Sequence, residues 1–181
     1  MNDVPDFAAA SPLLAGAYRF AHEAHHGARR TGDTDVDHPV AVARLLHEAG
    51  FEDEVVAAAL LHDVVEDSAT DVAEVRERFG APVGDLVAGM TEDDSIEPYE
   101  QRKAAHRDQV LAAGRDTAAI FAADKLVNAR DMAGAPTADE AKLDHYERTL
   151  EALCVEHPDL DFLGALRQEL LELRRSPGAP R

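Results

Sequence analysis

The sequence predicts a compact all-α fold, and three observations support this. Apolar residues recur at helical spacing, helix-start and helix-end signals divide the chain at short intervals, and no segment alternates polar and apolar residues as a strand does. Aromatic residues make up only 5% of the 181 residues and Trp is absent, a composition that favours helices over sheets. We expect one domain over residues 1–175 and a disordered tail over residues 176–181.

The signals in the first half of the chain predict five helices. Ser11 before Pro12 offers an N-cap followed by proline at the first helical position. Apolar residues on one face predict a second helix that ends at a glycine, and Asp53 is expected to cap a third. Asp71 with Glu74 forms a capping-box pattern before a short fourth helix, and a proline opens the fifth. The expected helices span residues 12–25, 38–50, 53–67, 72–79 and 82–90.

The second half predicts four more helices after an acidic loop at residues 91–95. Pro98 opens the first of these, and Asp116 caps the next, an apolar helix. Thr137 with Glu140 forms another capping-box pattern, and the last helix begins at Asp159. The first of these helices is expected over residues 98–114, and the second from residue 116 through at least residue 127. The third is expected to end at residue 156, and the fourth to span residues 159–174.

Charge and cysteine content limit the classes of function. The net charge is −18, whereas nucleic-acid binding usually requires a basic surface, so nucleic acid is not an expected partner. One cysteine, Cys154, excludes a disulfide framework and favours a reducing compartment. The N-terminus lacks a signal-peptide pattern, and no apolar run approaches the roughly 20 residues that span a membrane. We therefore expect a cytoplasmic protein with no membrane contact, while protein partners remain unknown.

The dipeptide His62-Asp63 at the end of an apolar run is the most informative feature of the chain. Burying an uncharged polar group without a partner costs roughly 2–7 kcal/mol, and burying a charge costs far more. A divalent cation is the simplest compensating partner. Adjacent helical residues point about 100° apart, so these two can bind one ion only if it lies between helices. Other helices must then supply further ligands, and His38 and Asp124 are the candidates.

These four residues form a nitrogen and oxygen ligand set that suits manganese, iron or zinc at an open site. Glu66 and Asp67 follow His62 and Asp63 by one helical turn. The helix dipole destabilises each carboxylate in the last turn of a helix by about 0.3–1 kcal/mol. A pair of carboxylates that is present there despite this cost suits general acid and base catalysis.

Each residue also has an ordinary structural explanation when considered alone. A His-Asp dipeptide can lie on the surface by chance, and Glu66-Asp67 can be a solvated helix end. Asp124 can be a core aspartate that pairs with Lys125 or Arg130. His38 can simply begin a helix, so spacing leaves the metal site and these explanations open.

The order of the motifs along the chain is typical of a known protein family. The chain resembles the HD-domain metal-dependent phosphohydrolases, specifically the hydrolase domain of RelA/SpoT-type proteins and the small stand-alone alarmone hydrolases. Residues 20–30 match the pattern "FA...H.G..R", and HD...ED at residues 62–67 precedes Asp124 and Asn128 at nearly the family spacing. The remaining matching stretches are residues 38–43, 58–61, 79–91 and 123–130.

The resemblance implies roles for individual residues. It makes His38, His62, Asp63 and Asp124 the metal ligands, with manganese the usual ion. It assigns Glu66 and Asp67 to activating water and moving protons. It implies four contacts to a phosphorylated nucleotide: the base by Arg30, the nucleotide by Asn128, phosphates by Lys103, and the substrate side by Tyr146.

The implied reaction removes pyrophosphate from the 3′ position of guanosine tetra- or pentaphosphate. Ala28, Thr31 and Phe121 depart from the family pattern, and three aspartates stand in the loop at residues 32–37. Two alternatives therefore stay open: hydrolysis of another nucleotide or phosphate ester at the same metal site, and a non-catalytic regulatory binding domain with the same fold.

Overall fold

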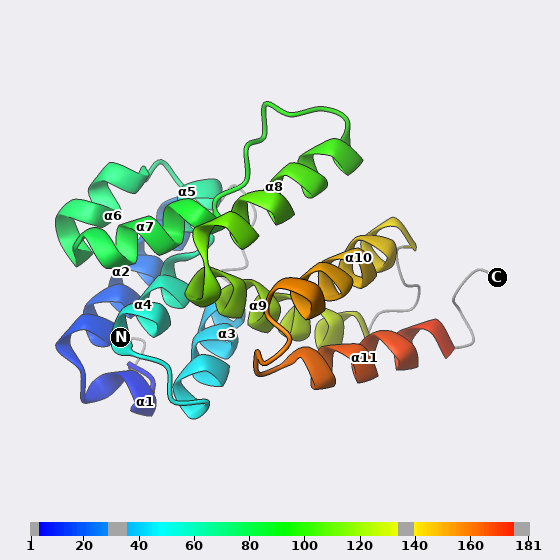
Figure 1. Ribbon diagram of the computed structural model, residues 1–181. Helices are drawn as coiled ribbons and strands as arrows, with labels where there is room; N and C mark the ends of the chain where they lie inside the picture. Colours follow the sequence, from blue (N-terminus) through cyan, green and yellow to red (C-terminus); the bar gives the residue numbers. More distant parts are fainter. Residues whose placement is uncertain (1–3, 29–35, 134–139, 176–181) are drawn as a thin grey trace. The chain divides into compact units, whose positions relative to one another are not determined.

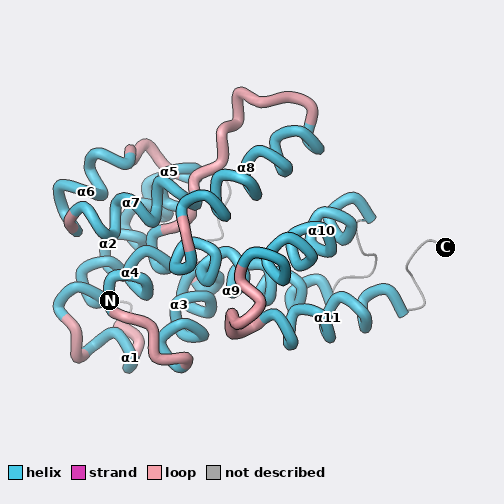
Figure 2. Tube along the Cα trace, in the orientation of Figure 1, coloured by secondary structure: helices cyan, strands magenta, loops and turns pink. Residues whose placement is uncertain are grey.

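The computed structural model describes residues 4–28, 36–133 and 140–175, and every regular element in these residues is a helix (Figure 1, Figure 2). The all-α prediction is confirmed. The chain forms two compact units, Met1–Glu92 and Asp93–Arg181. The expectation of one hydrolase domain over residues 1–175 stays a prediction, and the predicted tail at 176–181 lies outside the described residues.

The first unit is built around α4, whose residues from Val55 to Leu61 are all buried. A helix that is apolar on all sides must be covered on all sides. It packs against α2, α3 and α7, while α5 packs against α2 and α6 pairs with α7. The helices of this unit are α1 (Asp6–Ala9), α2 (Pro12–Ala28), α3 (Asp37–Glu48), α4 (Asp53–Leu61), α5 (Val64–Asp67), α6 (Val72–Phe79) and α7 (Ala81–Met90).

The second unit is built in the same way around α9, which is buried almost continuously from Thr117 to Val127. It packs against α8, α10 and α11, and the apolar stripe of α11 faces this core. The helices of this unit are α8 (Tyr99–Ala113), α9 (Arg115–Ala133), α10 (Glu140–Glu156) and α11 (Leu163–Arg175).

Two predicted caps are present. The Ser11 hydroxyl lies 3.4 Å from the Leu14 amide at the start of α2. The Asp71 carboxylate accepts a hydrogen bond from the Glu74 amide at 2.8 Å and caps α6. The predicted cap at Thr137 lies outside the described residues.

Four expectations for the helices were wrong. Asp116 does not cap α9, because α9 begins at Arg115 and Asp116 lies in its first turn. Asp53 does not cap α4, because Glu52 is the N-cap residue and Asp53 accepts a hydrogen bond from the Ser11 hydroxyl at 2.6 Å. The last helix begins at Leu163, since the Asp159 carboxylate binds Arg115 at 2.9 Å and Phe162 adopts a positive φ of 72°. The helix expected over residues 53–67 is interrupted at His62 and Asp63.

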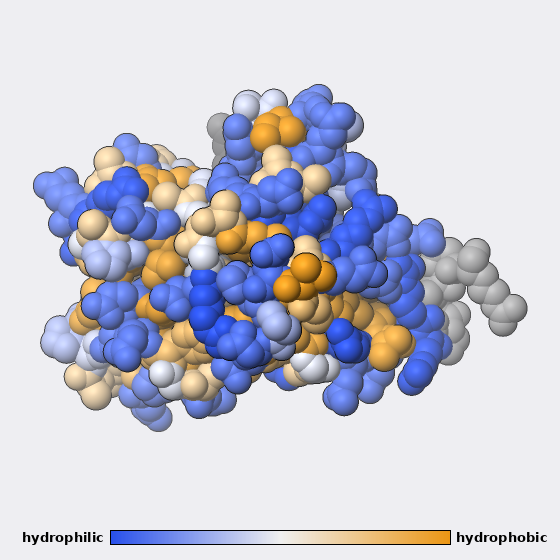
Figure 3. Space-filling model, viewed as in Figure 1, coloured by the Kyte–Doolittle hydropathy of each residue, from blue (hydrophilic) through white to orange (hydrophobic). Residues whose placement is uncertain are grey.

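The exposed face in Figure 3 is mostly hydrophilic, with small separate hydrophobic patches. Val155 and Leu171 are among the exposed large apolar residues. Among the described helices, none combines the length and the hydropathy needed to cross a membrane.

Candidate metal centre

The interruption between α4 and α5 shapes the candidate site in the first unit. His62 keeps helical dihedral angles, while Asp63 moves to φ −93° and ψ −8° as the N-cap of α5. The His62 Nε2 atom then lies 3.1 Å from Asp63 Oδ1, so the two side chains converge although they are adjacent in sequence. In an unbroken helix these two side chains would point about 100° apart, so the break is what allows them to converge.

A second contact orients the His62 ring. Its Nδ1 atom lies 2.8 Å from the carbonyl oxygen of Ala59, and a proton on Nδ1 is donated to that oxygen. Nε2 then carries the lone pair that a metal ion requires, an arrangement common among metal-binding histidines. His62 is only 3% exposed, so the ring and its contact with Ala59 are buried inside the protein.

His38, in the first turn of α3, lies next to His62. The two ring centroids are 5.5 Å apart, and one ring nitrogen of each lies within 4.8 Å of the other. Within the first unit, His62 therefore contacts two other predicted ligands, the imidazole of His38 and the carboxylate of Asp63. A lone pair facing a carboxylate oxygen is favourable only with a cation or proton between them, so this donor set fits a divalent metal ion.

Glu66 and Asp67 lie on α5, immediately after the converging ligands. The Glu66 carboxylate accepts a hydrogen bond from the Glu92 amide at 2.7 Å, which ties α5 to the end of α7. Burial of the carboxyl group raises the pKa of Glu66, and the negative charges of Asp63 and Glu92 add to this against the Glu92 hydrogen bond. Asp67 differs, because its side chain is 62% exposed.

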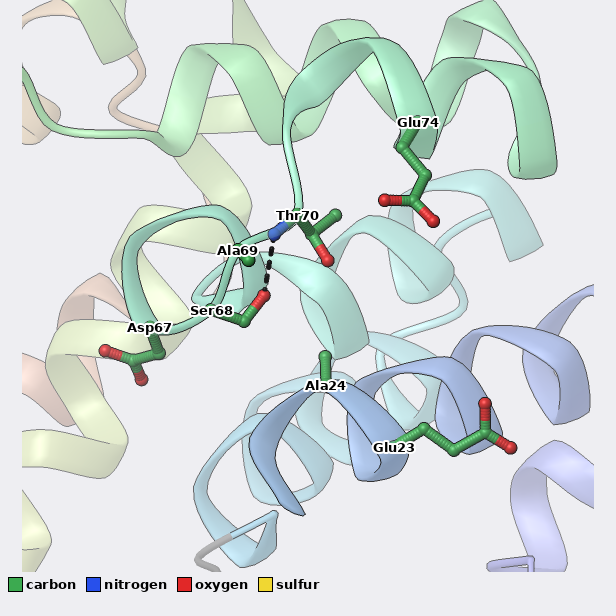
Figure 4. Close-up of a pocket in the computed structure, with 7 residues that line it drawn as sticks. All are labelled: Glu23, Ala24, Asp67, Ser68, Ala69, Thr70 and Glu74. Atoms are coloured by element: carbon green, nitrogen blue, oxygen red, sulfur yellow. Dashed lines mark hydrogen bonds between the residues drawn. The ribbon is translucent and has the colours of Figure 1, made fainter. Parts of the chain in front are cut away.

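Asp67 also lines a pocket of about 560 Å³, shown in Figure 4. Glu23 and Glu74 line the same pocket, but the carboxyl group of Asp67 points away from both of them (Figure 4). The three carboxylates do not converge, so this pocket is not a second ligand cluster.

The fourth predicted ligand, Asp124, lies on α9 in the second unit and is 6% exposed. Its carboxylate accepts hydrogen bonds from Lys125 Nζ at 2.6 Å and from Asn128 Nδ2 at 2.5 Å. The pairing with Lys125 that the sequence left open is therefore present, whereas Arg130 lies 3.3 Å from Glu169. The structure also brings together Asp124 and Asn128, two of the predicted site residues.

Cationic side chains surround two tyrosines of the second unit. Lys103 Nζ lies 5.4 Å from the ring centroid of Tyr99, and Lys125 Nζ lies 5.4 Å from that of Tyr146. Lys142 lies 5.7 Å from the Tyr146 ring, a contact that the sequence gave no reason to expect. Tyr146 is 3% exposed, so this predicted substrate residue also belongs to the core.

The nearby residue His145 reports the positive potential of this region. Burial lowers the pKa of its imidazole to about 3, and the positive charges of Lys125, Lys103 and Arg107 lower it further in that order. Five basic side chains thus contact the two tyrosines or act on His145: Arg102, Lys103, Arg107, Lys125 and Lys142. Arg30, the residue predicted to contact the base, lies outside the described residues.

Several known proteins are similar to this chain. A family model described as HD domain matches residues 17–150. The mouse protein named guanosine-3′,5′-bis(diphosphate) 3′-pyrophosphohydrolase MESH1 is 42% identical over 128 residues, which are 68% of this chain and 70% of that protein. A protein named as the same 3′-pyrophosphohydrolase, from Aquifex aeolicus, is 38% identical over 119 residues. That match takes in 64% of this chain but only 17% of the longer Aquifex protein.

Solved structures show the same likeness. A metazoan orthologue of SpoT, described as hydrolysing ppGpp and acting in starvation responses, has a TM-score of 0.72 at 26% identity. The match covers 91% of this chain and 95% of that one. The crystal structure of lmo0812 from Listeria monocytogenes has a TM-score of 0.66 at 30% identity, covering 77% and 94% of the two chains.

Proposed function

Because this chain belongs to the HD-domain family, we propose that it is a metal-dependent hydrolase that removes pyrophosphate from the 3′ position of guanosine tetra- and pentaphosphate. The observation that carries the proposal is that His62, immediately before the Glu66-Asp67 pair, contacts both His38 and Asp63. The relatives named as 3′-pyrophosphohydrolases and the SpoT orthologue described as hydrolysing ppGpp support the choice of substrate.

We assign the metal to four ligands. His38, His62 and Asp63 would hold it from the first unit, and Asp124 would supply the fourth ligand from the second. The family match spans all four residues. The mixed imidazole and carboxylate set suits manganese, iron or zinc, and we propose manganese because the family resemblance implies it. A bound divalent cation neutralises phosphoryl charge and makes a neighbouring water a stronger acid.

Glu66 and Asp67 divide the proton transfers in this proposal. Asp67 is exposed and accepts the proton of the attacking water. The water oxygen bonds to the phosphorus attached to the 3′ oxygen, and the bond between that phosphorus and the 3′ oxygen breaks. Glu66, whose pKa is raised, donates a proton to the departing 3′ oxygen. The products are pyrophosphate and the nucleotide with a free 3′ hydroxyl.

The charge of the substrate requires cations, and the second unit supplies them. We propose that Lys103 binds phosphate and that Asn128 contacts the nucleotide while it holds Asp124. Tyr146, with Lys125 and Lys142 against its ring, would form part of the substrate side of the site. Arg30 would stack on the base. The basic cluster around His145 supports an anion-binding role despite the net charge of −18.

We also propose a cytoplasmic location, supported by the single cysteine, which suits a reducing compartment.

The deciding experiment measures product formation by the whole chain. Metal-free protein is reconstituted with manganese, incubated with guanosine tetraphosphate, and the pyrophosphate and guanosine diphosphate are separated by chromatography. We expect turnover in the wild type, none in Asp63→Ala, and wild-type turnover in Asp85→Ala, which removes an aspartate that pairs with Arg76 on α6. Parallel reconstitution with zinc, iron and magnesium tests the choice of metal.

A wild-type protein that binds manganese but leaves guanosine tetraphosphate intact would contradict the substrate assignment. A panel of other nucleotides and phosphate esters then distinguishes a hydrolase with another substrate from a non-catalytic binding domain.

A further inference from the structure

We infer that His25 is a positioning residue that holds the carboxylate of Asp67 in the direction needed to accept the proton of the attacking water. This inference rests on the proposed function and adds a residue to its site. His25 belongs to the "FA...H.G..R" stretch, for which the sequence suggested no role for the histidine.

The contact joins a fixed side chain to a solvated one. His25 lies near the end of α2, which packs against α5, and its Nδ1 atom is 3.9 Å from Asp67 Oδ2. The His25 side chain is 6% exposed and that of Asp67 is 62% exposed. An exposed carboxylate alone samples several rotamers, whereas an almost fully buried imidazole does not. The immobile partner therefore determines the direction of the mobile one.

The distance indicates what kind of contact this is. At 3.9 Å the two atoms are within ion-pair range but beyond a direct hydrogen bond. Catalytic contacts often tighten only when the substrate binds, and a small rotation of the Asp67 side chain would shorten this one. His25 thus limits the rotation of Asp67 without immobilising it.

Among the described residues, the other ring nitrogen has no partner that would serve a proton relay. His25 Nε2 is buried and has no hydrogen-bond partner among the described residues. A proton on Nε2 would be a buried donor without an acceptor, so the neutral ring keeps its proton on Nδ1, toward Asp67. A relay needs an acceptor on its far side, and the described residues supply none, so they support a positioning role for His25.

The neighbours of Asp67 in its pocket do not replace this contact. Glu23 and Glu74 carry the same charge as Asp67, and its carboxyl group points away from both of them (Figure 4). Like charges do not attract, so a donor from α2 is what gives this carboxylate a preferred direction.

A double-mutant cycle tests the inference in the manganese-loaded full chain with guanosine tetraphosphate. His25→Leu removes the donor and keeps bulk, and His25→Asn restores an N–H near the position of Nδ1. We expect His25→Leu to lower kcat about tenfold with KM within about twofold, and His25→Asn to stay within about threefold of wild type. In an Asp67→Asn background, His25→Leu should have no further effect. His47→Leu makes the same chemical change at an exposed histidine of α3 and should change nothing.

A second measurement needs neither substrate nor metal. Three-bond NMR couplings to the Asp67 Cγ atom report how its side chain distributes among rotamers. We expect one dominant rotamer in the wild type and averaged couplings in His25→Leu. The couplings of Asp71, which caps α6, should be the same in both proteins.

Three results would overturn the inference. They are an equal loss of kcat when His25→Leu is placed in the Asp67→Asn background, an unchanged kcat in His25→Leu, and unchanged Asp67 couplings in that variant. If the wild type does not hydrolyse guanosine tetraphosphate, the proposed function fails, and the couplings alone decide whether His25 positions Asp67.

Discussion

Glu66 and Asp67 are neighbours in sequence, but their carboxyl groups meet different surroundings. Glu66 lies against the backbone of Glu92 and has a raised pKa, while Asp67 extends into solvent beside His25. Two carboxyls whose environments differ in this way can divide the roles of acid and base. The surroundings of these two residues therefore account for the acid and the base of the proposed reaction. The sequence identified the pair but not which carboxyl group takes which role.

The raised pKa of Glu66 predicts a pH-dependent cost to folding in the metal-free protein. An acid with a raised folded-state pKa stabilises the fold at low pH, and that contribution is lost as pH rises through the folded-state value. Glu66→Gln should therefore be more stable than wild type at pH 7, with a smaller difference at pH 4. Urea denaturation with a chelator present measures this. Equal differences at the two pH values would contradict it.

His145 predicts the opposite dependence. Its pKa is lowered to about 3 by burial and by Lys125, while an unfolded histidine titrates near 6.5. Below pH 6.5 this histidine takes up a proton in the unfolded chain but stays neutral in the folded chain. The free energy of unfolding therefore decreases as the pH is lowered. Between pH 7 and pH 5 wild type should lose about 2 kcal/mol more than His145→Leu in free energy of unfolding. Parallel losses in the two proteins, measured by denaturant titration, would show that His145 does not titrate in this way.

Among the elements, α6 and α7 approach each other closely at one glycine. A Cβ atom on Gly84 of α7 would lie 2.2 Å from Arg76 Cγ and 3.1 Å from Arg76 Cα on α6. Arg76 also pairs with Asp85, so its side chain is not free to move aside. Glycine here is a packing requirement that outweighs its low helix propensity.

Gly84→Ala should destabilise the protein by about 1–3 kcal/mol through this overlap, although alanine is the better helix former. Gly164→Ala is the matched control, because nothing lies within 4 Å of a Cβ atom at that position of α11. The control should be neutral or stabilising by a few tenths of a kcal/mol. Thermal and urea denaturation measure both variants, and a Gly84→Ala protein as stable as its control would refute the close packing.

For the whole molecule, the proposed metal links binding to stability. A ligand that binds only the folded chain stabilises it by about 2.7 kcal/mol at a hundred times its Kd. Manganese should therefore raise the thermal midpoint of wild type in a concentration-dependent way, and excess chelator should reverse this. Asp63→Ala should lose most of the increase. An equal increase in both proteins would place the ion elsewhere.

The sequence predicted most elements because their causes are local. Proline at the first position of α2, the Asp71 cap and the glycine after α6 act within a few residues, and each helix boundary at these points was confirmed. The wrong cap residue of α4 and the misplaced start of α11 have distant causes. Asp53 binds Ser11 across 42 positions and Asp159 binds Arg115 across 44, so neither contact is visible from its own neighbourhood.

The same distinction applies to the candidate site. Residue type and spacing were enough to name His38, His62, Asp63 and Asp124 as candidate ligands, because polar side chains in apolar helices need a compensating partner. Only the structure showed that the helix breaks at Asp63 and that Ala59 orients the His62 ring, and only its tertiary packing brings His25 of α2 to Asp67. Side-chain direction depends on which helices pack together, and residues 42 positions apart meet through packing that no local pattern encodes.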